Sequence, residues 1–238
     1  MVIVQQFADS VNKYAKAVQG QRLVLSLPDC CPNPDCQAEG ALIRWGYYRR
    51  WACTAERMVL LRIQRVRCKE CGRTHSLLPD FLHPHRQYAL DLMQRAVRLY
   101  LLVGLSWAHL MSSLPDPGPA RSTVREWLRS FGHGAGELLL DVVQRELMTL
   151  APLAELPEGA APHLARVRDP TRRRGLERAH RFWLLAERLY AQIKARLPRL
   201  HFSAQQLFGF LLHWLQSQQI PPRLFWSPAL PNTPTQPF

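Results

Sequence analysis

The chain of 238 residues carries 31 Lys and Arg against 18 Asp and Glu, a formal net charge of +13, and 47% of its residues are hydrophobic. This length allows one large domain or two small ones, and the hydrophobic content excludes wholesale disorder. The positive charge predicts a polyanionic partner, either nucleic acid or anionic lipid. No apolar run reaches the roughly 20 residues of a membrane span, and residues 1–20 lack the features of a signal peptide. We therefore expect a cytoplasmic protein that associates with the nucleoid.

Residues 1–20 are expected to form an N-terminal helix, and residues 21–82 a zinc ribbon. All six cysteines lie in this ribbon, and four of them form two pairs with the spacing of metal ligands, Cys31 with Cys36 and Cys68 with Cys71. In a Cys-x-x-Cys-Gly turn both sulfurs face one point, and the glycine relieves the tight turn. Because we expect a reducing compartment, the thiolates indicate metal and not disulfides. Four thiolates predict one closed, structural Zn²⁺ site.

Two further ligand assignments stay open. Cys30 could take the place of Cys31, and His75 could replace one of the thiolates. The alternative to a metal site is that the cysteines are unrelated buried side chains. Two pairs on either side of a hairpin pattern favour the metal, which would supply the folding free energy that so small an apolar core cannot.

Between the cysteine pairs, residues 41–52 and 58–68 are predicted to form a β-hairpin, because both are rich in β-branched, aromatic and Arg residues and a short turn separates them. Residues 41–75 carry nine Lys and Arg against two Glu, interleaved with four Trp and Tyr side chains. Such a run can be a merely solvated surface, but Arg beside flat aromatic rings suits phosphate contact and stacking. The arginines of the ribbon that are predicted to bind DNA are Arg44, Arg49, Arg50, Arg62, Arg65, Arg67 and Arg73.

Helical periodicity begins after the ribbon, and residues 83–135 are predicted to form a helix-turn-helix. We expect a first helix over 88–102 and a second over 106–114, capped by Ser106. The sequence Thr123-Val-Arg-Glu is a capping box that predicts the start of a third helix, and Gly132 is expected to end it. The turn before the third helix contains three prolines and is longer than the motif usually has.

The third helix is predicted to be a DNA-recognition helix. Its apolar residues face one side, and arginines recur every four residues on the other, so that three guanidinium groups form one stripe. Arginines placed in this way can pair bidentately with guanine or with phosphate. The alternative is an ordinary amphipathic helix with a solvated basic face. The residues assigned to DNA contact are Arg121, Ser122, Thr123, Arg125 and Arg129.

Residues 136–219 are expected to be a helical region that holds a second copy of the chain or a recombinase. Helices are predicted over 137–150, 176–197 and 203–219, and a Pro- and Ala-rich linker over 151–162. Arg172, Arg173 and Arg174 precede the second of these helices, as a DNA backbone contact or a solvated loop. Residues 220–238 hold six prolines and are expected to be an extended tail. The expected fold class is mainly α with a small β zinc ribbon.

Over residues 27–135 the chain resembles the zinc-ribbon and helix-turn-helix front ends of bacterial insertion-sequence transposases. It is still more similar to a small bacterial family of transposon-associated proteins. The stretches that carry the resemblance are CKECGRTH at 68–75, LLPDFLHPHRQY at 77–88, GLSW at 104–107 and STVREWL at 122–128. The resemblance implies structural zinc on the four paired cysteines and contact of Arg121, Arg125 and Arg129 with element-end DNA. The acidic-triad nuclease domain of those transposases has no counterpart in this sequence.

We therefore expect a protein of a bacterial mobile element that binds double-stranded DNA with sequence specificity, recognises transposon ends or a target site, and assists a recombinase. No set of residues typical of a catalytic site stands out, so the prediction is non-enzymatic. Three alternatives stay open: a transcriptional regulator, a minimal transposase or nuclease with a degenerate active site, and an RNA-binding subunit whose ribbon aromatics stack on bases.

Overall fold

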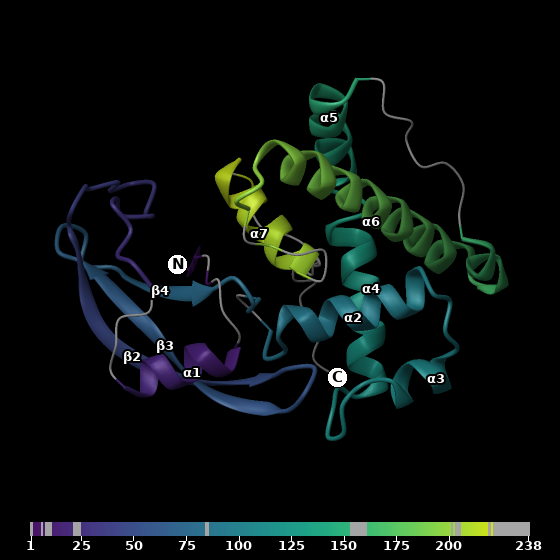
Figure 1. Ribbon diagram of the computed structural model, residues 1–238, viewed down its shortest axis with the longest axis horizontal. Coiled ribbons are helices and arrows are strands. Elements are labelled where there is room, and N and C mark those ends of the chain that lie inside the picture. The colour runs from purple at the N-terminus through teal and green to yellow at the C-terminus, as the bar shows by residue number, and fades with distance from the viewer. Residues whose placement is uncertain are drawn as a thin grey trace, which may run out of the picture. The chain divides into compact units, whose positions relative to one another are not determined.

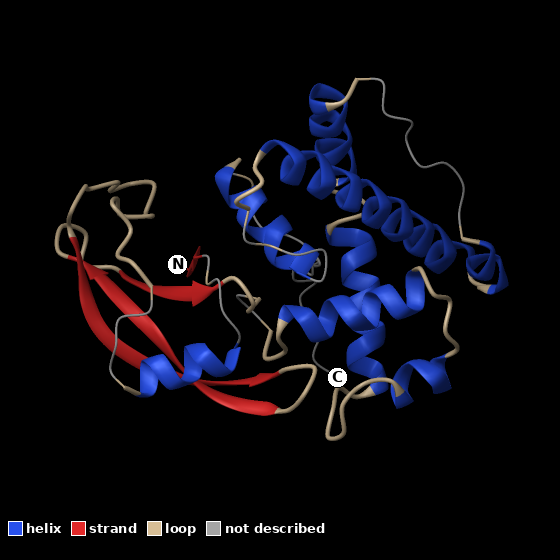
Figure 2. Ribbon diagram, viewed as in Figure 1, coloured by secondary structure: helices blue, strands red, loops and turns tan. Residues whose placement is uncertain are grey.

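A computed structural model describes residues 2–5, 7, 11–20, 25–83, 86–152, 161–200, 202, 206–218 and 220. The described residues form seven α-helices and a four-stranded sheet (Figures 1 and 2), so the structure is mixed α and β. Within the described parts of the chain, every helix is too short or too polar to cross a bilayer. Residues 153–160 of the predicted linker and residues 221–238 of the predicted tail lie outside the described residues.

The chain divides into two units. Unit 1 comprises residues 1–95, 114–118 and 201–221, and unit 2 comprises residues 96–113, 119–200 and 222–238. Unit 1 therefore includes the cysteine-rich segment, and unit 2 includes the arginine-rich helices.

Unit 1 is built on a sheet with the strand order β1-β4-β3-β2. The predicted hairpin is confirmed, since β2 (Leu42–Cys53) and β3 (Met58–Cys68) pair antiparallel. Two further strands were not expected from the sequence: β4 (Thr74–Pro79) pairs antiparallel with β3, and β1 (Val2–Gln5) pairs parallel with β4. The predicted N-terminal helix is shorter than residues 1–20, because β1 precedes α1 (Val11–Gln19).

The core of unit 1 lies between the sheet and α1, which packs against the hairpin (Figure 2). Tyr14 of α1 is fully buried, its ring packs edge-on 5.6 Å from that of Phe81, and its hydroxyl donates to the Arg62 carbonyl of β3 at 3.2 Å. Burial raises the pKa of the Tyr14 hydroxyl well above its usual range. Leu61 and Ile63 of β3 are fully buried in the same cluster. These contacts fix the middle of the hairpin on the body of the unit.

Helices complete unit 1. The first residues of α2 (Leu90–Leu101) belong to it, and so does α7 (Leu207–Ser217). The side-chain oxygen of Gln94 accepts a hydrogen bond from the Phe208 backbone N–H at 2.9 Å. Both termini of α7 fall inside the helix predicted over 203–219, of which residues 203–205 and 219 lie outside the described residues.

Unit 2 is helical. It contains α3 (Trp107–Ser112), α4 (Arg121–Gly134), α5 (Leu140–Leu150), the short 3₁₀ helix η1 (Pro162–Arg166) and the long α6 (Pro170–Arg196). Its core joins α4 to α6 through buried aromatic rings, and the ring of Phe131 packs edge-on 5.5 Å from that of Phe182. The Ser106 side chain accepts from the His109 N–H, which confirms the predicted cap of α3.

Two helix starts differ from the prediction. Helix α4 begins at Arg121 behind the N-cap residue Ala120, which makes no side-chain cap, and it runs past Gly132 to Gly134. The predicted capping box at Thr123 is therefore wrong. Helix α6 begins at Pro170, so the arginine run that was expected to precede the helix lies in its first turns. The Asp169 carboxylate accepts the Arg172 backbone N–H at 2.6 Å, which together with a proline at the first helical position is a strong start signal.

Helices α4 and α6 cross at two glycines (Figure 1). A Cβ built on Gly132 would lie 2.8 Å from the Gly175 carbonyl oxygen, closer than real Cβ contacts come. The glycine at position 132 therefore allows the two backbones to approach. By contrast, a Cβ built on Gly175 would meet no atom within 4 Å. Only one of the two glycines is needed for the crossing.

We expect Gly132→Ala to destabilise the protein, because the new methyl group overlaps a backbone oxygen. Such overpacking costs about 1–3 kcal/mol, which outweighs the gain of up to about 1 kcal/mol in helix propensity. Gly175→Ala is the matched control and should stabilise by up to about 1 kcal/mol. Urea unfolding followed by circular dichroism measures both, and a Gly132→Ala variant as stable as the wild type would contradict the close crossing.

Candidate metal centre and arginine cluster

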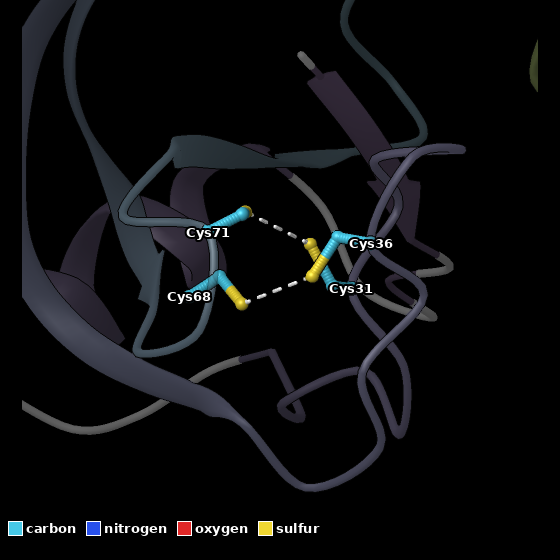
Figure 3. Close-up of side chains that lie close together, drawn as sticks. All are labelled: Cys31, Cys36, Cys68 and Cys71. Carbon is cyan, nitrogen blue, oxygen red and sulfur yellow. Dashed lines mark hydrogen bonds between the residues drawn. The ribbon is translucent and has the colours of Figure 1, made fainter.

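Four cysteine sulfurs of unit 1 converge on one point (Figure 3). The Sγ atoms of Cys31 and Cys71 are 3.8 Å apart, those of Cys36 and Cys68 are also 3.8 Å apart, and all four lie within 4.8 Å of one another. A disulfide bond is about 2.05 Å long, so these are free thiols. Four ligands at about 2.3 Å from a tetrahedral centre are separated by about 3.8 Å, which is the spacing found here. The set could therefore hold one metal ion.

Two similar turns carry the sulfurs. After Cys68 and Cys71 the chain turns back at Gly72, whose φ is +68°, and the Gly72 N–H donates to the Cys68 carbonyl at 3.1 Å. After Cys36 the chain does the same at Gln37, whose φ is +51°. The residue that follows the second cysteine of each pair therefore has a left-handed backbone. The glycine predicted to relieve the second turn is confirmed, whereas the first turn uses a non-glycine residue.

Backbone N–H groups stabilise negative charge on three of the sulfurs, each from two residues further along the chain: Asn33 to Cys31, Ala38 to Cys36 and Arg73 to Cys71. The backbone bond from Arg73 lowers the pKa of Cys71 to about 7. Burial has the opposite effect on Cys31 and raises the pKa of its thiol to about 12. A divalent cation removes this conflict, because metal binding deprotonates thiols outright.

The structure bears on both alternative ligands, Cys30 in place of Cys31 and His75 in place of one thiolate. Cys30 is exposed, whereas Cys31 belongs to the four-sulfur group. His75 is buried beside the group, and its Nε2 atom lies 3.6 Å from Cys31 Sγ. Burial, with the charge of Arg73, lowers the pKa of His75, so at neutral pH its ring is neutral and can donate a hydrogen bond to the sulfur. A partner of this kind orients a metal ligand without joining the donor set.

The ribbon arginines do not form one surface. Strand register places residues of paired strands on the same face when they lie directly opposite, and it puts Arg49 opposite Arg62 and exposed Trp51 opposite Leu60. The Arg62 guanidinium lies 4.9 Å from the ring centre of Tyr47. By alternation along β3, Arg65 and Arg67 lie on the other face, where Arg67 lies 4.7 Å from the ring centre of Trp45. Arg44 is exposed near the bulge of β2.

Two arginines predicted to bind DNA make contacts with other residues of unit 1. The half-buried Arg50 donates to the backbone carbonyls of His83, at 2.6 Å, and Arg86. Burial lowers the pKa of Arg50. Arg73 donates to the side-chain oxygen of Asn33 at 2.8 Å and lies 3.9 Å from an Asp35 oxygen. It therefore joins one cysteine turn to the other.

In unit 2, three guanidinium groups gather around the ring of Trp107. Arg121 and Arg125 of α4 lie 5.3 Å from the ring centre, and Arg172 of α6 lies 6.0 Å from it. The ring of Tyr100 packs on the same indole, with 5.0 Å between ring centres. Among the described residues no carboxylate is ion-paired with any of the three arginines. We call this group the Trp107 arginine cluster.

The other predicted DNA contacts of unit 2 are placed as follows. Arg129 donates to the Glu126 carboxylate through two nitrogens, at 3.1 and 2.5 Å. Arg173 lies 3.8 Å from a Glu177 oxygen. Ser122 and Arg174 are exposed, and Thr123 is half-buried. The predicted stripe of three arginines on the third helix therefore contains two in the Trp107 arginine cluster and one that is neutralised by its own helix.

Trp107 was not predicted from the sequence as a member of the candidate site. The available signal was an aromatic residue directly after the cap Ser106, but local sequence could not bring it to Arg172, which lies 65 positions further along. The membership of Arg172 in a shared cluster with Arg125 was missed for the same reason.

A family described only as a domain of unknown function (DUF6431) matches residues 31–102. The match begins at Cys31 and includes all four clustered cysteines, the hairpin and α2. No curated protein matches the chain. No solved structure matches it either.

We expect Cys68→Ser to lose the bound metal and to unfold residues 27–80, because a serine hydroxyl cannot replace the thiolate in a closed four-sulfur site. Metal analysis of the purified protein should fall from about one ion per chain to near zero, and amide hydrogen exchange in β2 and β3 should accelerate. Cys30→Ser is the matched control and should keep its metal. Full metal content in Cys68→Ser would refute the ligand assignment.

Proposed function

We propose that this protein binds double-stranded DNA and is not an enzyme. The observation that carries the proposal is the Trp107 arginine cluster, in which Arg121, Arg125 and Arg172 lie within 6.0 Å of one indole ring centre. Three guanidinium groups around one ring repel one another, and the repulsion is relieved when phosphates neutralise them. An arginine-rich site that lacks carboxylate partners among the described residues is therefore suited to a polyanion.

The α3–α4 pair supports a helix-turn-helix role for unit 2. Helix α3 is short and capped, and α4 exposes Arg121, Ser122 and Arg125 in its first turns. In a helix-turn-helix the N-terminal residues of the second helix enter the major groove, where Arg pairs bidentately with guanine. We assign Arg121 and Arg125 to base or phosphate contact, and Arg172 to a phosphate contact from the start of α6.

The hairpin offers a second surface for the phosphate backbone. Arg49 and Arg62 face each other directly across β2 and β3, an arrangement that destabilises a sheet unless an anion shares the two charges. Exposed Trp51 lies on the same face, so a sugar or base edge can pack beside the phosphate. We propose zinc as the metal of the cysteine cluster, since it prefers four thiolates in tetrahedral geometry, and assign it the role of holding the hairpin ends together.

For the biological role we propose recognition of the ends or target site of a bacterial mobile element, as the accessory of a recombinase. The support is the sequence resemblance over residues 27–135 together with the surfaces described above. Transcriptional control of the element is an alternative role that would use the same contacts with duplex DNA. A nuclease function differs from both, because it would nick supercoiled DNA in a metal-dependent reaction.

A second candidate function is favoured by the exposed tryptophans of the hairpin. Trp45 is 46% and Trp51 is 54% exposed, and exposed aromatic rings beside Arg bind unpaired bases by stacking. In that case the hairpin binds single-stranded RNA. Tighter binding of single-stranded RNA than of duplex DNA, lost in Trp51→Ala, would support this candidate over the first.

We expect Arg125→Ala to weaken binding of specific duplex DNA by about 1–3 kcal/mol if Arg125 contacts a base, or to reduce the salt slope by about one if it contacts a phosphate. Fluorescence anisotropy titrations over a range of salt concentrations measure both. Arg145→Ala on α5, an exposed arginine outside the cluster, removes the same charge and should leave affinity almost unchanged. Equal affinities of the wild type, Arg125→Ala and Arg145→Ala for the duplex would show that Arg125 does not contact DNA.

A further inference from the structure

A hollow of about 520 Å³ lies between α4 and the first turns of α6 in unit 2. Its apolar wall is formed by Leu128 and Leu176, which are both buried, and its polar lining includes Arg125, Arg129 and Arg172. The volume is in the range of small-molecule sites, which combine apolar walls with a few polar groups. It is larger than a lone phosphate or carboxylate needs.

The lining is strongly cationic. Asp169 is the one carboxylate among the described lining residues, and its Oδ1 already accepts the Arg172 backbone N–H at 2.6 Å. His133 also lines the hollow and is paired with Glu137 at 2.7 Å. Arg129 is paired with Glu126, which leaves Arg125 and Arg172 without a carboxylate partner in the described part of the chain. These two guanidinium groups are available to an anionic ligand.

Gly175 is a second, independent indication that the hollow is a ligand site. It lies inside α6 and lines the hollow, and a Cβ built on it meets no atom within 4 Å. Glycine in a helix interior destabilises the helix relative to alanine, and packing does not require one here. The missing side chain keeps the hollow open.

We propose that this hollow binds a single nucleotide, with the phosphate on Arg125 and Arg172 and the base against Leu128 and Leu176. The inference rests on the proposed function, because Arg125 and Arg172 also belong to the Trp107 arginine cluster. A ligand on these residues is therefore continuous with the proposed DNA surface. The nucleotide has two sources, a free mononucleotide or an unpaired nucleotide at the end of a bound duplex, and the chemistry of the pocket is the same for both.

The test compares three probes on the full chain by anisotropy and calorimetry: deoxyadenosine monophosphate, a closed DNA dumbbell without ends, and the same duplex with a short single-stranded overhang. The wild type should bind the overhang duplex about tenfold more tightly than the dumbbell, or bind the free mononucleotide. Preference for the overhang without binding of the mononucleotide assigns the site to DNA ends. Binding of the mononucleotide without that preference assigns it to a free nucleotide.

Gly175→Met fills the hollow, and Gly175→Ala is its matched control with most of the space left. Gly175→Met should abolish overhang preference or mononucleotide binding and leave dumbbell affinity unchanged, whereas Gly175→Ala should retain both properties.

A wild type that binds dumbbell and overhang duplexes equally and does not bind the mononucleotide overturns the inference, and this comparison needs no variant. If the wild type binds the dumbbell in that experiment, the proposed DNA function stands while the nucleotide site falls. Absence of dumbbell and overhang binding overturns the proposed function itself.

Discussion

The convergence of four sulfurs is the constraint on which unit 1 depends. Cys68 is the last residue of β3 and Cys71 follows it in the next turn, while Cys31 and Cys36 belong to a separate turn before β2. The two turns meet at the sulfurs, with Arg73 bound to Asn33 beside them. Burial raises the pKa of the Cys31 thiol to about 12, whereas the pKa of the half-buried Cys71 is about 7, and a shared cation would stabilise both as thiolates. A metal ion held by the four sulfurs would therefore stabilise the joint between the turns and, with it, the base of the hairpin.

Unit 2 depends in the same way on the close crossing of α4 and α6. Because position 132 has no side chain, α4 packs directly on the Gly175 carbonyl. The first turn of α6, which carries Arg172, therefore lies near the arginines of α4. This contact gathers Arg172 with Arg121 and Arg125 on one indole. The resulting concentration of positive charge, and not any single arginine, is the physical basis on which we propose a polyanionic ligand.

The sequence predicted local structure well where several signals agreed. The hairpin strands and the cap at Ser106 were found, and so were the four clustered cysteines, because alternation, capping chemistry and ligand spacing are all local patterns. It failed where two local signals competed. Thr123 with Glu126 matches a capping box, yet α4 begins at Arg121. In a helix that starts there, the Glu126 N–H already bonds within the helix and is not free to be capped by Thr123. The start signal at Asp169 and Pro170 was overlooked in favour of the arginine run.

The amino-acid sequence by itself determined the strongly basic character of the protein, its metal-ligand spacing and most of its helices, because these depend on composition and on neighbours along the chain. Tertiary structure alone decided which arginines have partners within the fold and which have no carboxylate partner among the described residues. Arg50 and Arg73 bind backbone or side-chain oxygens of unit 1, and Arg129 pairs on its own helix. Strands β1 and β4, Trp107 and the open space at Gly175 likewise depend on contacts between residues distant in sequence. Charge is a property of each side chain, whereas its availability to a ligand depends on the neighbours that folding provides.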